Sequence, residues 1–168
     1  MKLKTLVIGI AFLCVSTYVS AQNKMAHINF NELVQVMPES KAAIETLQKM
    51  SGDYQAQLDK LAQEFKTKNE AFEKEKATMQ GAIKDFKIKD LQDLQKKFED
   101  FKKAANTDIQ KKREDLINPI IKKAKDTIAA IAKDKGYNYV VDSGSNTYVY
   151  MNAGDDIMAL AKKKLGIE

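Results

Sequence analysis

Few side chains in this sequence have the chemistry for catalysis or metal binding. His27 is the only histidine, and one imidazole in an alternating segment cannot by itself form a metal site or a relay with serine and aspartate. Asp155 and Asp156 stand where a helix is expected to begin, so we interpret them as capping carboxylates rather than an acid–base pair. No glycine-rich phosphate-binding pattern occurs. The sequence therefore predicts no enzyme, no metal site and no cofactor.

The only cysteine, Cys14, lies in a segment that is expected to be removed. Residues 1–21 combine two early lysines, an apolar run and a small-residue ending, which is the pattern of a secretory signal peptide cleaved after Ala21. The apolar run at 6–15 has about ten residues, whereas a membrane-spanning helix needs roughly 20. We therefore expect an exported mature chain without thiol chemistry.

Clusters of basic residues are the next candidate binding feature. They are Lys96 and Lys97, Lys102 and Lys103, Lys111 to Arg113, and Lys162 to Lys164. Such clusters could follow a polyanion, but acidic residues are interleaved with them, which is typical of a solvated helix face. No nucleic-acid reading motif accompanies them. We expect at most weak contact with an anionic membrane surface or lipopolysaccharide, and no nucleic-acid partner.

The elements that carry these side chains are predicted to be mainly long helices. Residues 40–135 are rich in Lys, Glu, Ala and Leu, and Pro119 is their only proline. Apolar residues recur at steps of three, four or seven, which places a narrow apolar stripe along each of two helices. Two such stripes cover each other only if the chain folds back around Gly81. The sequence therefore predicts an antiparallel coiled-coil hairpin over residues 38–116, with its tip near 78–86.

Two prolines and a glycine mark the ends of this arm. Pro38 can begin the outgoing helix, with Glu39 placing negative charge in the first turn. Pro119 removes a backbone hydrogen bond within the return helix and is expected to kink it where the arm enters the body. Gly136 follows two lysines and an aspartate and is expected to end that helix.

The flanking segments alternate between apolar and polar residues and predict three strands, at 25–30, 137–142 and 147–151. The last two are expected to form a hairpin through 143–146. A short amphipathic helix closes the chain. The predicted fold is α+β but mainly α, with the long arm attached to a small three-stranded body made of residues 22–37 and 117–168.

So small a sheet has open edges and apolar residues on both faces, and it rarely stands alone. We expect copies of the same chain to cover it, so that assembly is coupled to folding. The residues predicted to make this contact are Ile28, Phe30, Tyr139, Val141, Tyr148, Val149 and Tyr150.

Aromatic and methionine side chains on the arm are the candidate residues for binding other proteins. They are Phe65, Phe72, Met79, Phe86, Phe98 and Phe101. Most should form the contact line between the two helices. A two-helix arm cannot bury such large groups completely, so part of their surface is expected to remain available to unfolded polypeptides.

Several motifs in the mature chain resemble those of the Skp/OmpH family of periplasmic chaperones. Residues 132–142 read A-K-x-K-G-Y-x-x-V-x-D, and 38–42 match the start of that family's long helix. Residues 148–150 and 156–157 match its later strand and helix start, although Met158 replaces the usual threonine there. The similarity extends over essentially the whole mature chain, and the departures affect only a helix cap.

This resemblance implies a homotrimer whose bodies form a hub and whose three hairpins surround a cavity. Unfolded outer-membrane proteins would be held there without ATP, through many weak contacts. A second hypothesis is a structural coiled-coil adaptor or spacer of the cell envelope that binds one folded partner. The third is a binder of anionic surfaces.

Overall fold

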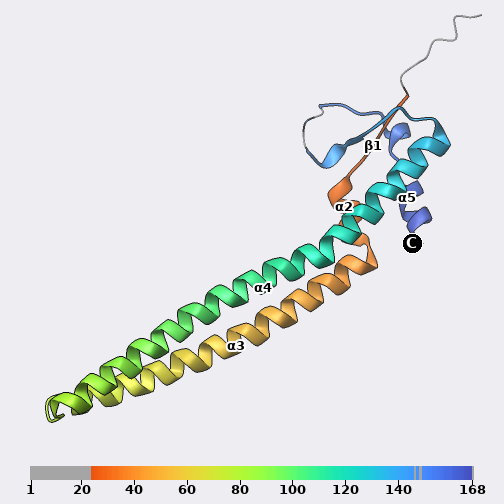
Figure 1. Cartoon of the computed structure of the whole chain (residues 1–168). Helices are drawn as coiled ribbons and strands as arrows, with labels where there is room; N and C mark the ends of the chain where they lie inside the picture. The colour runs from red at the N-terminus through yellow and green to blue at the C-terminus, as the bar shows by residue number, and fades with distance from the viewer. Residues whose placement is uncertain (1–23, 146, 148, 168) are drawn as a thin grey trace, which may run out of the picture.

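The computed structural model describes residues 24–145, 147 and 149–167. The predicted leader at 1–21 therefore lies outside the described residues. In order, the elements are β1 (Met25–Ile28), α2 (Phe30–Val36), α3 (Pro38–Glu75), α4 (Gly81–Lys135), β2 (Tyr139–Asp142), the 3₁₀ turns η2 (Ser143–Ser145) and η3 (Ala153–Asp155), and α5 (Met158–Leu165). Helices α3 and α4 run side by side as an arm, and the other elements form a small body at one end (Figure 1).

Helix α3 begins at Pro38, whose fixed φ suits the first helical position, and it continues for 38 residues. The chain then turns through residues 76–80, and α4 begins at Gly81. The predicted tip at 78–86 overlaps this turn but extends too far, because residues 81–86 already belong to α4. Gly81 is not among the positive-φ glycines, so the turn does not depend on a left-handed residue there.

Helix α4 has 55 residues and continues without a break through Pro119. At roughly 1.5 Å per residue it is about 80 Å long. Beyond Pro119 its buried residues, Ile120 and Ala124 among them, belong to the core of the body. The helix ends at Gly136, where φ is 70° and the N–H donates to the carbonyl oxygens of Ala132 and Lys133. The predicted glycine stop is thus confirmed.

The sheet consists of β1 and β2, which pair in parallel with Met25 opposite Tyr139 and Ile28 opposite Asp142. The entire arm connects the two strands in sequence. The predicted hairpin between 137–142 and 147–151 is not formed in the single chain: η2 follows β2, and residues 147 and 149–151 are not in a strand. Tyr148 lies outside the described residues. A strand needs a partner for its backbone groups, and among the described residues β2 finds this partner in β1.

Helix α2 corrects the prediction that the first strand extends through Phe30. The side chain of Asn29 ends the strand, because its Oδ1 accepts a hydrogen bond from Glu32 N at 3.1 Å and caps the helix. Asp142 Oδ1 at the end of β2 accepts a second one from Phe30 N at 3.1 Å. The spacing of Phe30, Leu33, Val34 and Met37 after a capping asparagine could have revealed this helix.

Side chains from β1, α2, the arm base and α5 close around one core. Its largest fully buried side chains are Ile28, Leu33, Met37 and Ile157. Ile131 from the last turns of α4 joins them. Within the part of the chain that the structure describes, no helix is both long enough and apolar enough to cross a bilayer.

Gly144 tests how tightly the β2–α2 junction is packed. A Cβ atom there would lie 2.6 Å from Asn29 Oδ1 and 3.2 Å from Asp142 Oδ1, the two caps of α2. We expect Gly144→Ala to lower the free energy of unfolding by about 1–2 kcal/mol in urea titrations. Gly52→Ala is the control, because its Cβ meets nothing within 4 Å on α3 and should stabilise the protein by up to about 1 kcal/mol. A Gly144→Ala protein with an unchanged free energy of unfolding would contradict this packing.

Candidate functional site

Three polar contacts join the two helices of the arm at different heights. Near the body Glu39 pairs with Lys123, and farther out Tyr54 Oη donates to Asp108 Oδ2 at 2.9 Å. Toward the turn Lys68 reaches from α3 to α4, with its Nζ 3.0 Å from Asp90 Oδ2. These contacts fix which residues of the two helices face each other.

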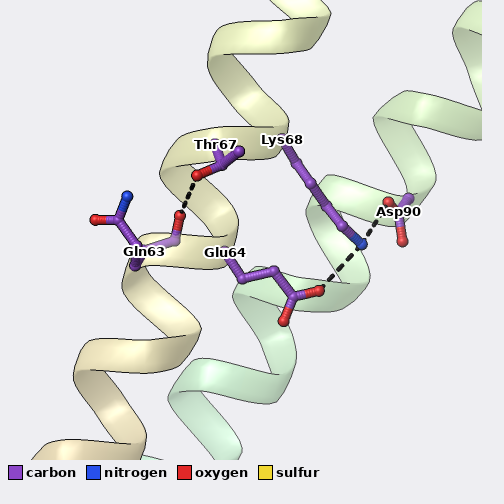
Figure 2. A network of polar contacts seen from close by, with 5 residues as sticks. All are labelled: Gln63, Glu64, Thr67, Lys68 and Asp90. Atoms are coloured by element: carbon purple, nitrogen blue, oxygen red, sulfur yellow. Dashed lines mark hydrogen bonds and ion pairs between the residues drawn. The ribbon is translucent and has the colours of Figure 1, made fainter.

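Figure 2 shows the contact nearest the turn, where Lys68 lies between two carboxylates. Its Nζ is also 3.2 Å from Glu64 Oε1, one helical turn earlier on α3. The hydrogen bonds to Asp90 and then to Glu64 raise the pKa of Lys68 above its ordinary value. Thr67 Oγ1 donates to the carbonyl oxygen of Gln63 at 2.9 Å and so stays bound to its own helix.

The pKa values of two further cross-linking groups are shifted for the same reason. The hydrogen bond to Asp108 raises the pKa of Tyr54, and the hydrogen bond from Lys123 lowers the pKa of Glu39. Both groups are accessible to water, so solvent screens these contacts. Their contribution is to define helix register more than to supply stability.

Two of the predicted binding residues meet across the arm. Phe65 of α3 and Phe98 of α4, with Ala62 and Gln95, line an open cavity of about 240 Å³. Phe101 instead packs edge-on against Tyr54, with ring centroids 5.8 Å apart. The Phe65–Phe98 cavity is therefore apolar space between the helices that the arm's own side chains leave unfilled.

The other predicted arm residues lie closer to the turn. Phe72 and Met79 are half-buried, whereas Phe86 is 69 % exposed and contributes little to the contact between the helices. The structure thus distributes the six predicted residues along the arm instead of gathering them at one place.

A groove lies at the base of the arm, and the sequence did not predict it. It has a volume of about 550 Å³ and is lined by Ile44, Leu47, Gln48, Ser51, Ile109, Arg113 and Ile117. Ile44 is 48 % exposed there. Its spacing of three residues from Leu47 on α3 was the available signal. This groove adds apolar surface to the same arm.

The predicted contact residues of the body fall into two groups. Ile28 is only 2 % exposed and belongs to the core of its own chain, so it has little surface to offer a partner. Tyr139 is 60 % exposed, and Val149 and Tyr150 are almost fully exposed; Tyr148 lies outside the described residues. Phe30 and Val141 line a groove of about 440 Å³ together with Ile28, Lys125, Ile128, Ala129, Ala132, Val140 and Asp142. The described body thus carries an open apolar groove and exposed aromatic side chains.

The polar candidates of the body have structural contacts. His27 Nε2 lies 3.0 Å from the carbonyl oxygen of Asn152, which can only accept, so this nitrogen carries the proton. Asp156 Oδ1 accepts from Met158 N, the first residue of α5, at 2.8 Å, whereas the N-cap position itself is Ile157, which makes no side-chain cap. Asp155 lies in η3 instead. Among residues 24–145, 147 and 149–167, no group of three possible metal ligands occurs.

Several residues of the basic clusters pair with carboxylates. Lys96 Nζ lies 2.6 Å from Asp100 Oδ2, four residues later on α4, and this hydrogen bond raises the pKa of Lys96. Lys164 pairs with Asp134 at 3.1 Å in the body. Such pairs are expected for the solvated helix face that the sequence indicated.

Comparisons with known proteins agree with the motifs found in the sequence. The model of the family described as "Outer membrane protein (OmpH-like)" matches residues 24–165. A "Chaperone protein Skp" of Pectobacterium atrosepticum is 23% identical over 143 residues, covering 85% of this chain and 86% of the relative. The protein of the same name from Photorhabdus laumondii is 23% identical over 157 residues, covering 94% of this chain and 93% of that one.

A solved structure has the same fold. The crystal structure of an OmpH-like outer membrane chaperone from Caulobacter crescentus superimposes with a TM-score of 0.73 at 13% sequence identity, and the match covers 89% of this chain and 88% of that one. The resemblance inferred from the sequence motifs is thus confirmed. Because the family model spans nearly the whole described chain, this protein belongs to the OmpH-like outer membrane protein family.

Proposed function

We propose that this chain is a periplasmic holdase, which binds unfolded outer-membrane proteins and prevents their aggregation without ATP. Export would follow from the predicted signal peptide at 1–21, cleaved after Ala21. Two relatives at 23% identity carry the name of a chaperone. The observation that carries the proposal is the open cavity between Phe65 and Phe98, because it offers apolar surface that the protein does not use for its own fold.

Binding at such a surface draws on the hydrophobic effect alone. An apolar side chain of an unfolded client that enters the Phe65–Phe98 cavity leaves water and contacts two aromatic rings. A second contact is available at the groove around Ile44 and Leu47, nearer the body. Each contact is weak. Several contacts along one arm that bind the same polypeptide at the same time slow its release.

Oligomerisation would bring several arms to one client. We propose that three copies assemble through their bodies, with the exposed Tyr139, Val149 and Tyr150 contacting apolar surface of a neighbouring copy. The apolar groove beside β2 is a surface of the required kind. A closed ring covers the same patch on every copy, and its arms would enclose a shared space.

Suppression of aggregation tests this function directly. Mature protein is mixed with a urea-denatured outer-membrane barrel protein during dilution, and light scattering is followed. We expect scattering to be suppressed at one assembled complex per client. Full scattering at that ratio would reject the holdase, and crosslinking to a single folded partner would instead favour the adaptor hypothesis.

The cavity has its own test. We expect Phe65→Ala together with Phe98→Ala to weaken client retention roughly tenfold, because two large apolar contacts are lost. The control pair is Gln63→Ala with Lys97→Ala, which changes exposed side chains of the same two helices. Fluorescence titration with labelled client measures the affinity, and circular dichroism checks that the arm stays helical. Equal affinity in both variants would place client binding elsewhere.

A further inference from the structure

The groove at the arm base contains the only arginine of the chain. Arg113 is the one arginine in a sequence with 28 basic residues, and it lines this groove with Ile109 and Ile117 of the same helix. A guanidinium is flat and more weakly hydrated than an ammonium group, so it suits apolar surroundings better than lysine does. An arginine among apolar side chains is typical of a surface that binds another protein.

Arg113 has no anionic partner within the part of the chain that the structure describes. No described carboxylate lies within ion-pairing distance of its guanidinium. The other residues that line the groove are all uncharged, namely Ile44, Leu47, Gln48, Ser51, Ile109 and Ile117. The groove therefore offers one unpaired positive charge beside apolar walls, which fits an apolar partner surface that carries a carboxylate.

The spacing of the lining residues matches the face of a helix. Ile109, Arg113 and Ile117 follow each other at steps of four on α4, so each is about 6 Å from the next along the helix axis. On the opposite wall α3 contributes positions i, i+3, i+4 and i+7 within 44–51, which also share one face. The groove is thus about two helical turns long on each wall.

A helix fits this groove better than an extended segment does. Both walls belong to helix interiors, where the backbone groups are already hydrogen-bonded within α3 and α4. An extended segment would place its own N–H and C=O groups against apolar side chains without partners, which costs free energy. A helix has its backbone groups paired internally, and its side chains at steps of four repeat the spacing of the α4 wall.

Two polar contacts across the arm hold the walls of the groove in place. Glu39 pairs with Lys123 on the side of the body, and Tyr54 Oη donates to Asp108 Oδ2 on the side of the turn. The lining residues of both helices lie between these two contacts. A preformed groove costs a partner less free energy than one that must be ordered on binding.

We propose that the arm-base groove binds an amphipathic helix of another protein, with a carboxylate of that helix against Arg113. The bound face carries apolar side chains four residues before and after the acidic one, beside Ile109 and Ile117. A second copy of this chain, packed through the same face, would bring no carboxylate, because none of the described lining residues is acidic. The site goes beyond client holding, because it selects a helix and not an unfolded polypeptide.

Titration with a designed peptide tests the choice of a helix. The probe is a fluorescein-labelled, stapled helical peptide of about 18 residues, with leucines four positions before and after one glutamate. By fluorescence anisotropy, we expect it to bind the mature protein roughly 10-fold more tightly than the same peptide carrying two helix-breaking prolines. Equal affinity of the two peptides, or no binding of the helical one, would overturn the proposal.

Arg113→Gln tests the charge. We expect the Kd of the glutamate peptide to rise roughly 10-fold, because its carboxylate loses a charged partner. The Kd of a matched glutamine peptide should change less than about twofold. Lys112→Gln is the control, since Lys112 is exposed but does not line the groove. Equal weakening of both peptides by Arg113→Gln, or equal effects of the two substitutions, would refute the pairing. No unfolded client enters this titration, so its failure would leave the holdase proposal standing.

Discussion

Replacing Val149 with aspartate should separate the assembled protein into single chains. In one chain Val149 is fully exposed and Tyr150 is 84 % exposed, in the segment between β2 and α5. If a neighbouring copy covers these side chains, the substitution places a carboxylate at an apolar contact in every copy of the ring. Burying an unpaired charge costs several kcal/mol, so we expect the dissociation constant to rise by more than about 100-fold.

Light scattering coupled to size exclusion gives the mass that decides this prediction. The unmodified protein should have the mass of three chains, and Val149→Asp the mass of one. Ala104→Asp, on the exposed side of α4, adds the same charge away from the body and should leave the mass unchanged. A Val149→Asp protein that keeps its full mass would show that the interface lies elsewhere, and a single-chain mass for the unmodified protein would remove the trimer proposal.

Local signals in the sequence predicted the arm well. Helix-forming composition and apolar spacing predicted two antiparallel helices, and Pro38 and Gly136 marked a start and a stop that the structure confirms. The cross-arm contacts were not predictable, because they depend on the length of the turn. Moving the turn from 78–86 to 76–80 changes which residues face each other. The Lys68–Asp90 pair is therefore visible only in three dimensions.

The body was harder to predict because its contacts join distant parts of the chain. Alternation identified β1 and β2 but could not show that they pair with each other across the whole arm. It also led to the prediction that Ile28 contacts a neighbouring copy, because alternation does not tell which face of a strand is covered by the same chain. Ile28 lies instead in one core with Leu33 of α2, and the prediction of a strand through Phe30 had left this helix out.

Helix α2 therefore gives the body its sharpest stability test. Leu33 has no exposed surface and lies in the core with Ile28, Met37 and Ile157. We expect Leu33→Ala to lower the free energy of unfolding by about 3 kcal/mol, because a cavity replaces the side chain in a body that has few other buried groups. This corresponds to a Tm lower by roughly 10 °C.

Leu61→Ala is the matched control, because Leu61 is only half-buried on the arm. It removes the same atoms from a site that water already reaches, and the loss should be about 1 kcal/mol. Urea unfolding at one fixed protein concentration measures both variants, since assembly would make stability depend on concentration. If Leu33→Ala cost no more than Leu61→Ala, α2 would not be holding the body together. If it costs more, α2, the helix that the strand prediction left out, holds together the core that it shares with β1, the arm base and α5.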